Sequence, residues 1–589
     1  MTAKITPIKA IVTIILSACA GAMLCMNTIG IENFLLHILI IIISAVSLKI
    51  QQVRLPKARL FKAGSFLLAL VWLMGHSFSI DNSLRSIVQS YRHIVKSAVY
   101  VVGATFFIYQ LCRLLFLLLE SSYKKQSDFI KKPFIFLLIC WGIPVITCYP
   151  ANLCNDVWNQ LSQYFGFSAF TAHHPPVHTL IIGFFTQVGV WIGDANIGLY
   201  FFILAQTLIY ALVLSYSFTL LKKLSAPGWL LFLSIITAGL SPYYANRVSL
   251  VLKDNLYSVA VLLFITELVY ALLDFSGFLK SKKHICLWTL SVLGILLFRN
   301  NGKHILYPTV LVLLVILFKK RKVFSRQTVF QSLGLLFLPI LFAGAINLAV
   351  TNSFGIQKGS IAEALSLPFQ QTARCVWEHG SEITSEEQKA IGAVLDYANL
   401  ATNYSPIISD PVKATFNRQS TTEDLIQYFK IWFKMFFKYP DTYISATVNQ
   451  NYFLFYPFAE NQAIYMEFND FSEELMAPLK QEVGLHEVTI FDSAKVLLTK
   501  WFGLLHHTPI IGLFSNPAFY TLVFLFVVLL AIANKTYKLL IPALPIVLSV
   551  VVIILAPVII GHPRYAFPII YTLPVLLAYY MYLRRQTLN

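Results

Sequence analysis

The chain has 589 residues, of which 57% are hydrophobic and only 12% are charged, and its mean hydropathy is +0.69. Soluble globular proteins carry about 25% charged residues, so the composition excludes a soluble protein and indicates a polytopic membrane protein. The net charge of +18 is unevenly distributed. Residues 351–500 hold 18 of the 27 acidic side chains, whereas most basic side chains form short clusters between apolar runs. Such clusters are typical of cytoplasmic loops, and no nucleic-acid partner is expected.

Apolar runs along the chain predict an all-α polytopic membrane protein with about 14 transmembrane helices. The segment Leu16–Cys19 resembles a lipoprotein cleavage box, but its apolar run continues to Met26, which favours an ordinary first span. The expected spans are 9–29, 33–49, 59–79, 95–119, 132–148, 198–221, 227–240, 254–273, 284–298, 303–318, 327–350, 517–533, 538–558 and 565–583.

A further apolar segment, Pro176–Ile192, is ambiguous because it is apolar enough to cross a membrane. If it crossed, five later clusters of Lys and Arg would all lie outside the cell. If it lies along the outer interface, all five clusters fall in the cytoplasm, as positively charged loops normally do. We therefore expect an interfacial helix here and both chain termini inside.

The pattern of spans divides the chain into four parts. Residues 351–515 lose the continuous apolar character and predict a mainly helical extracytoplasmic domain, in which a capping-box pattern begins a helix at Thr384 or Ser385. The expected parts are N-terminal transmembrane helices (1–131), a membrane core (132–350) with its first outer loop at 149–197, the extracytoplasmic domain (351–515) and C-terminal transmembrane helices (516–589).

Polar residues gather in four loops that this topology places at the outer ends of the spans. The loops are far apart in sequence, yet they share one membrane face, so we expect them to form a single site. They contain Asn155, Asp156, His173 and His174 in the first loop, Arg247, Lys253 and Asp254 in the second, Arg299, Asn300 and Lys303 in the third, and Arg564 and Tyr565 in the last.

These residue types suggest attack on an activated, phosphate-linked group at the membrane surface. A carboxylate can deprotonate an acceptor hydroxyl, and Asp156 or Asp254 fits that role. Arg and Lys can hold a phosphate leaving group and neutralise the charge that develops on it. Lys253, Arg299 and Arg564 fit this second role.

Each of these residues also has a simpler interpretation. Asp156 could cap the helix that follows it, and Lys253 could pair with the adjacent Asp254. Arg299, Lys303 and Arg564 could extend to lipid head groups. His173 and His174 could bind a metal, although adjacent histidines rarely chelate well and contact with a substrate is favoured. Cys148 and Cys154 could form a disulfide, although free thiols are favoured.

The order of these features resembles that of the GT-C membrane glycosyltransferases, which use polyprenyl-phosphate sugars as donors. The resemblance covers about residues 132–350, more loosely 517–583, and the remaining parts look like additions of a bacterial subfamily. The matching features are Asn155-Asp156 after a span, His174-Pro175-Pro176 ending the first loop, Lys222-Lys223 closing a later span, Ser241-Pro242 with Lys253-Asp254 in the second loop, and Arg564-Tyr565 before the last apolar run.

The resemblance implies transfer of a sugar from a polyprenyl-phosphate donor to a cell-envelope glycan or glycolipid outside the bacterial cytoplasmic membrane. The anomeric centre would be inverted, with Asp156 as the general base and the membrane lipid, donor and acceptor as partners. The sequence establishes no cofactor, and the polyprenyl-phosphate sugar enters as the donor substrate. Many relatives have Asp-Glu where this chain has Asn155-Asp156, which leaves dependence on a divalent metal, Mg or Mn, open.

Two other classes of function compete with this interpretation. A polysaccharide polymerase or ligase also uses polyprenyl-linked glycans and carries a large outer loop between late spans, as this chain does. A lipid or glycan transporter or flippase would show broken spans, charges at mid-membrane depth and repeated halves. Here the charges stand at span ends and no repeat is visible. A non-catalytic scaffold would leave the polar outer loops unexplained.

Overall fold

The computed structural model describes residues 7–27, 33–120, 133–461, 473–508, 510–556 and 559–588. Within these ranges the chain is helical and forms no strand, only isolated bridges, which confirms the all-α prediction. Nine helices of the described residues are long and apolar enough to cross a membrane, or ten if the bent pair Gly228–Leu240 and Pro242–Ser249 is one span. The fold is therefore of the multi-pass membrane type. The expected number of 14 spans stays a prediction, because other apolar helices are shorter.

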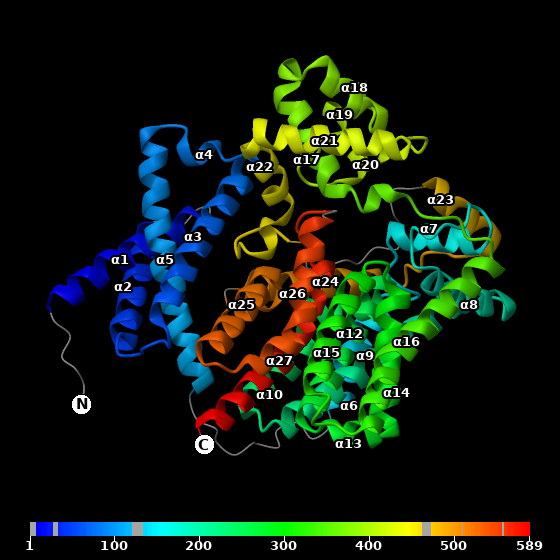
Figure 1. Ribbon diagram of the computed structural model, residues 1–589, viewed down its shortest axis with the longest axis horizontal. Helices are drawn as coiled ribbons and strands as arrows, with labels where there is room; N and C mark the ends of the chain where they lie inside the picture. Colours follow the sequence, from blue (N-terminus) through cyan, green and yellow to red (C-terminus); the bar gives the residue numbers. More distant parts are fainter. Residues whose placement is uncertain are drawn as a thin grey trace.

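The N-terminal helices form a bundle at one side of the molecule (Figure 1). Gly103 allows two of them to approach closely, since a Cβ atom there would lie 2.2 Å from the carbonyl oxygen of Cys19. Small residues at such crossings are typical of membrane helices. The helices are α1 (Pro7–Met26), α2 (Asn33–Ile50), α3 (Ala58–Asp81), α4 (Arg85–Val88) and α5 (Tyr91–Glu120).

The membrane core surrounds two central helices, α12 and α27, which pack against each other. The apolar window of each is 83% buried, as expected for helices that are apolar on all sides. The core contains α6 (Pro133–Thr147), α7 (Asn155–Tyr164), α8 (Pro176–Trp191), α9 (Ala195–Lys223), α10 (Gly228–Leu240), α11 (Pro242–Ala245), α12 (Lys253–Leu273), α13 (Phe275–Lys280), α14 (Lys282–Phe298), α15 (Gly302–Lys320), α16 (Arg326–Ser353), α25 (Pro517–Ala533), α26 (Leu540–Leu555) and α27 (Phe567–Leu588).

A helical lobe, residues 361–451, stands above this core (Figure 1). Thr384 begins α18 with the expected capping box to Glu387. The lobe has its own hydrophobic core, whose buried residues run from Ala362 to Tyr443. Its helices are α17 (Ser366–His379), α18 (Ser385–Val394), α19 (Tyr397–Asn403), α20 (Asp410–Ala414), α21 (Thr422–Lys438) and α22 (Pro440–Asn451).

The chain that follows the lobe returns to the membrane part earlier than expected. Buried residues from Phe453 to Phe502 belong to the main core, not to the core of the lobe. The physical reason is that Tyr452 and Tyr456 pack on the N-terminal bundle, with the Tyr456 hydroxyl donating a hydrogen bond to Asn27 Oδ1 at 2.5 Å. The separate core is thus smaller than the expected domain 351–515. The segment also includes α23 (Glu473–Pro478) and α24 (Asp492–His507).

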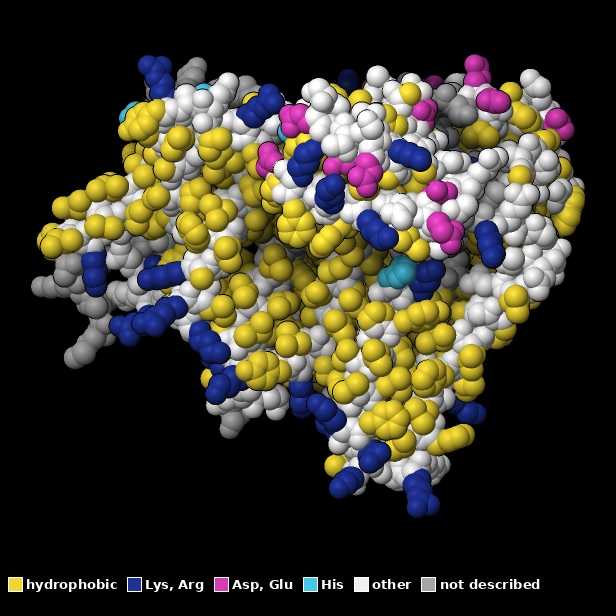
Figure 2. Space-filling view, turned by 45° about the horizontal axis from the view of Figure 1, so that its top comes forward, with side chains coloured by type: hydrophobic (Ala, Val, Ile, Leu, Met, Phe, Trp, Pro, Cys, Tyr) yellow, Lys and Arg dark blue, Asp and Glu magenta, His cyan; other side chains and the backbone are white. Residues whose placement is uncertain are grey.

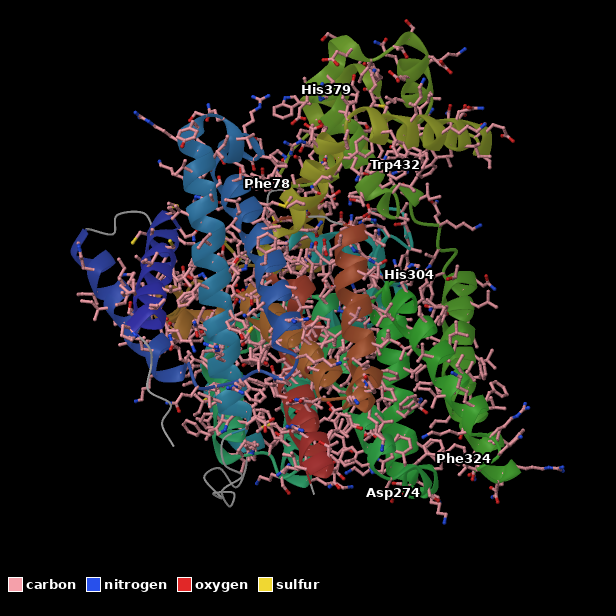
Figure 3. All side chains as sticks on the ribbon, turned by 60° about the vertical axis from the view of Figure 1, so that its left-hand side comes forward. Phe78, Asp274, His304, Phe324, His379 and Trp432 are labelled. Carbon is pink, nitrogen blue, oxygen red and sulfur yellow. The ribbon has the colours of Figure 1, made fainter. Side chains whose placement is uncertain are left out.

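The two ends of the molecule differ in charge. Figure 2 shows Asp and Glu side chains at the end with the lobe, where Lys and Arg are interspersed with them, whereas the opposite end shows Lys and Arg without acidic side chains, and an apolar belt lies between the two ends. In Figure 3, Asp274 and Phe324, from expected cytoplasmic loops, lie at the end far from His379 and Trp432 of the lobe. This arrangement agrees with the sidedness that the basic clusters predict. The α7 and α8 helices lie near the lobe end (Figure 1), and the interfacial location of α8 stays a prediction.

Cysteine labelling tests this sidedness. In a Cys286→Ser background, which removes the exposed native cysteine, we expect an impermeant maleimide to label Glu386→Cys in intact cells and to leave Lys222→Cys unlabelled until the membrane is opened. Glu386 lies on the lobe, whereas Lys222 ends α9. Labelling of Lys222→Cys in intact cells would invert the predicted topology.

Candidate active site

Asp156 lies between two cationic side chains, Lys253 and Arg564. The Lys253 Nζ atom donates a hydrogen bond to Asp156 Oδ2 at 2.8 Å, and Arg564 Nη1 donates to the same oxygen at 3.2 Å. These side chains are 25% (Asp156), 17% (Lys253) and 12% (Arg564) exposed. The structure therefore brings together residues of the first, second and last expected outer loops. We call Asp156, Lys253, Arg564, Asp254 and Arg299 the ion cluster.

Asn152 aligns the first loop with the second. Its backbone N–H donates to the Ser249 carbonyl at 2.8 Å, and its own carbonyl accepts from the Val251 N–H at 3.1 Å. Its side-chain amide donates to Ser249 Oγ at 2.9 Å. These bonds form an isolated parallel bridge between the two loop segments. Each segment enters a helix a few residues later, so Asp156 in α7 faces Lys253 in α12.

Two buried amides fix the second loop where it enters α12. The Asn255 side chain donates to the carbonyls of Arg247 and Leu250, at 2.9 and 2.7 Å. The Gln206 side chain of α9 donates to the carbonyls of Val248 and Leu250, at 3.1 and 3.0 Å. Buried carbonyl groups need such partners. The loop is consequently held rigidly, and the position of Lys253 is set before any substrate arrives.

The second ion pair of the cluster joins Arg299 Nη1 to Asp254 Oδ1. Tyr565 lies between this pair and the first, because its ring centroid is 5.6 Å from the Arg299 guanidinium carbon and 5.0 Å from that of Arg564. Both distances are in the cation–π range. The Tyr565 hydroxyl also accepts a hydrogen bond from Arg564 Nη2 at 3.0 Å.

These contacts correct three of the simpler interpretations. Lys253 does not pair with the adjacent Asp254, since the two residues bind partners on different loops. Arg299 and Arg564 turn inward to carboxylates and do not extend to lipid head groups. Asp156 is not the helix cap, because Cys154 holds the N-cap position of α7 without a side-chain hydrogen bond.

His174 adds a neutral acceptor to the cluster. Its Nδ1 atom lies 2.8 Å from Lys253 Nζ, and because an ammonium group only donates, Nδ1 accepts and carries no proton. Burial, together with the nearby Lys253 charge, holds the pKa of His174 well below its usual value.

His173 is more exposed, and its Nδ1 atom is 3.8 Å from Glu363 Oε1. Asn300 of the third loop donates to the His173 carbonyl at 3.1 Å.

The charge state of Asp156 follows from its neighbours. Burial raises its pKa, but the positive charges of Lys253 and Arg564 outweigh burial and hold the pKa well below the usual range. Asp156 is thus ionised at neutral pH. A carboxylate stabilised in this way is a weak base until its cationic partners bind another anion.

Three of the expected substrate-binding residues lie outside this cluster of contacts. Asn155 is exposed at the first position of α7. Lys303 is exposed on α15, and within the described residues no ion pair joins it to the cluster. Arg247 is fully buried, with its guanidinium carbon 5.4 Å from the Phe567 ring centroid. Its charge therefore acts on the site through the protein interior and not by direct contact with a substrate.

The donor set does not fit a divalent cation. Asp156 Oδ2 already accepts from two cations, and Asp254 is paired with Arg299. Mg²⁺ and similar ions need several free oxygen ligands, and the described part of the chain contains no group of three His, Cys, Asp or Glu residues arranged to hold a metal. Cys148 and Cys154 are both free thiols, so the disulfide left open by the sequence does not form.

Several residues that build the site were missed in the sequence. Asn152, Gln206, Asn255 and Tyr257 position the loops, with the Tyr257 ring centroid 5.3 Å from the Arg299 guanidinium carbon. A signal was available for Gln206, because an amide inside an apolar span is costly unless it has a partner. Asn152 and Asn255 offered no comparable signal, since loop amides are common.

The fold and the ion cluster define an all-α, multi-pass membrane protein with a charged site at the lobe-facing ends of its central helices. The sequence profile of a family of unknown function, DUF6020, matches residues 165–589. The chain therefore belongs to this family. No curated protein and no solved structure matches the chain. Lys253, Asp254, Arg299 and Arg564 lie within the matched residues, whereas Asp156 lies just before them.

The buried ion pair of Arg299 and Asp254 yields a stability prediction. Arg299→Met leaves Asp254, only 3% exposed, without its counter-ion, and breaking such a pair typically costs about 3–5 kcal/mol. We expect the free energy of unfolding, measured by SDS titration in mixed micelles, to fall by about that amount. Adding Asp254→Asn should restore part of it.

Lys303→Met is the matched control, because Lys303 is exposed and its replacement should change stability by less than about 0.5 kcal/mol. Equal effects of Arg299→Met and Lys303→Met would contradict the assigned ion pair.

Proposed function

We propose that the protein is a GT-C-type glycosyltransferase that moves a sugar from a polyprenyl-phosphate donor to a glycan or glycolipid outside the bacterial cytoplasmic membrane. One observation carries the proposal, namely the position of Asp156 between Lys253 and Arg564 in a partly exposed cluster. The arrangement combines a carboxylate that can accept a proton with cations that can hold a phosphate.

The charge balance of the cluster suits an anionic donor. Lys253, Arg299 and Arg564 carry three positive charges against the two negative charges of Asp156 and Asp254. A donor phosphate would compete with Asp156 for Lys253 and Arg564, since both cations form stronger hydrogen bonds to ionised oxygens. Arg299 and Asp254 would remain paired and support Tyr565 beside the site.

Donor binding would thereby activate the base. Once the phosphate pairs with Lys253 and Arg564, their stabilisation of the Asp156 carboxylate weakens, so the pKa of Asp156 rises toward its usual range and the carboxylate is released. The acceptor oxygen then attacks the anomeric carbon, the bond from that carbon to the phosphate oxygen breaks, and the acceptor proton passes to Asp156. The phosphate leaves with the bonding electrons, held by Lys253 and Arg564. A single displacement inverts the anomeric centre.

The lobe is suited to select the acceptor because it contacts the rim of the site at two places. Glu363 lies 2.7 Å from Lys413 of α20 and 3.8 Å from His173. The Ile560 N–H donates to the Ile407 carbonyl at 2.9 Å, four residues before Arg564. The lobe thus spans the first and last loops of the site.

Asp156→Asn tests the role of the base. General-base catalysis contributes about 10²–10⁴-fold, so we expect sugar transfer by the purified variant to fall by that factor. Donor affinity should not weaken, because the substitution removes a carboxylate that competes with the phosphate. One measurement is turnover. The other is the dissociation constant of decaprenyl phosphate, a polyprenyl phosphate that carries the lipid and phosphate of the donor without its sugar. Both are made on protein that elutes as a folded species.

Asp274→Asn is the matched control, since Asp274 caps α13 at the opposite end of the molecule and Asn caps equally well. Turnover of Asp156→Asn within tenfold of the wild type would place the base elsewhere.

Arg564→Met tests the phosphate contact. A hydrogen bond to a charged group contributes about 1.5–3 kcal/mol, so the dissociation constant of decaprenyl phosphate should rise about ten- to hundredfold, and turnover should fall with it. Lys303→Met, which removes an exposed charge of a neighbouring loop, should leave both nearly unchanged. If the two variants bind decaprenyl phosphate equally well, Arg564 does not hold the donor.

A further inference from the structure

A large apolar groove runs between the N-terminal bundle and α25, which lie side by side in Figure 1. Its volume is about 1270 Å³, above the range of about 300–1,000 Å³ that is usual for small-molecule sites. It follows α3 from Phe61 to Trp72, a helix length of about 16 Å. Phe107, Leu115 and Phe526 are among the side chains that line it. A long hydrocarbon chain fits this shape and lining.

The groove lining includes a set of polar residues without a cation, which we call the rim. The rim consists of Glu460, Asn461, His506, His507 and Asn516. Burial, together with the neighbouring His507, lowers the pKa of His506, so that His506 is neutral at pH 7. Among the described residues that line the groove, none is Lys or Arg, and Glu460 is the one carboxylate.

This rim adjoins the ion cluster. Gly561, with φ of +69°, packs so closely that a Cβ atom there would lie 2.8 Å from the Glu460 carbonyl oxygen. The Tyr243 hydroxyl donates to Asn461 Oδ1 at 2.7 Å. Gly561 precedes Arg564 by three residues, a distance of at most about 11 Å along an extended chain. A head group at the rim therefore stands beside the loop that carries Arg564.

We infer that the groove holds the hydrocarbon chain of a lipid acceptor with an uncharged, hydroxyl-rich head group, that is, a glycolipid. The inference rests on the proposed function and names the acceptor class for the same site. Amide, imidazole and carboxylate groups at the rim can bind sugar hydroxyls. The Glu460 carboxylate repels a phosphate head group. The donor phosphate binds Lys253 and Arg564 instead.

Donor and acceptor would then approach the ion cluster from different sides. The donor phosphate occupies the cations, while the acceptor hydroxyl comes from the groove rim past Gly561 toward Asp156. The N-terminal bundle, which contributes α3 and α5 to the groove, lies outside the residues that match the family profile. The bundle thus contributes to the groove, whereas the donor cations Lys253 and Arg564 stand on the membrane core.

Photolabelling of the full-length protein in nanodiscs tests the inference. The probe is a monoglucosyl diacylglycerol with a diazirine on one acyl chain, compared with phosphatidylglycerol that carries the same chain. We expect the glycolipid probe to label α3 and α25 peptides at least tenfold more than the phosphatidylglycerol probe. Equal labelling of these peptides by the two probes would overturn the assignment of an uncharged head group.

Gly64→Phe is the blocking variant. A Cβ atom at Gly64 meets only Leu529 Cδ1, at 3.5 Å, an ordinary contact, so the new ring enters the groove without moving the backbone. We expect it to lower glycolipid labelling at least tenfold and to leave the dissociation constant of decaprenyl phosphate unchanged. Gly344→Phe is the matched control, because nothing lies within 4 Å of a Cβ atom there, and it should label as the wild type does.

Two further results separate this inference from the proposed function. Glu460→Lys should shift the preference of the groove from the glycolipid probe toward phosphatidylglycerol, and an unchanged preference would contradict the role of the rim.

If Gly64→Phe weakens decaprenyl phosphate binding and leaves glycolipid labelling intact, the groove belongs to the donor and the inference is wrong. Labelling requires no turnover, so failure of Asp156→Asn to reduce transfer would overturn the proposed function and leave the groove assignment standing.

Discussion

The shared hydrogen bonding of Asp156 with Lys253 and Arg564 is the interaction on which the arrangement of this site depends. Placing charges in a partly buried position is costly unless each has a partner. Here the Asp156 carboxylate pairs with Lys253 and Arg564, which belong to two other loops. Neither cation has this partner unless its loop approaches the loop that carries Asp156. The approach of Asp156 in α7 to the first residue of α12 and to the segment just before α27 meets that requirement.

The two central helices make this meeting point rigid. The α12 and α27 helices are buried on nearly all sides, and both begin at the ion cluster, with Lys253 opening α12 and Arg564 just before α27. Sites whose charged groups are held by a rigid scaffold need little reorganisation when charge develops during a reaction. The Gln206 and Asn255 amides extend this rigidity into the loop between α11 and α12.

Much of this arrangement could be predicted from the sequence because charge sidedness and span ends are one-dimensional signals. Basic clusters fix which loops share a face, and polar residues at span ends then indicate where a site forms. The pairing within the site could not be predicted, because it depends on how each loop turns. Lys253 and Asp254 are adjacent in the chain, yet the start of α12 directs them to different partners, Asp156 and Arg299. The extent of the separate hydrophobic core of the lobe could not be predicted either, because aromatic residues such as Tyr456 suit either core.

The central claim is that the donor phosphate takes the two cations that hold Asp156. A cryo-electron microscopy structure with decaprenyl phosphate bound tests it most directly. The account predicts phosphate oxygens within hydrogen-bonding distance of Lys253 Nζ and Arg564 Nη1, with Asp156 Oδ2 released from both. Decaprenyl phosphate bound at another place, with Asp156 still paired to Lys253 and Arg564, would contradict the account.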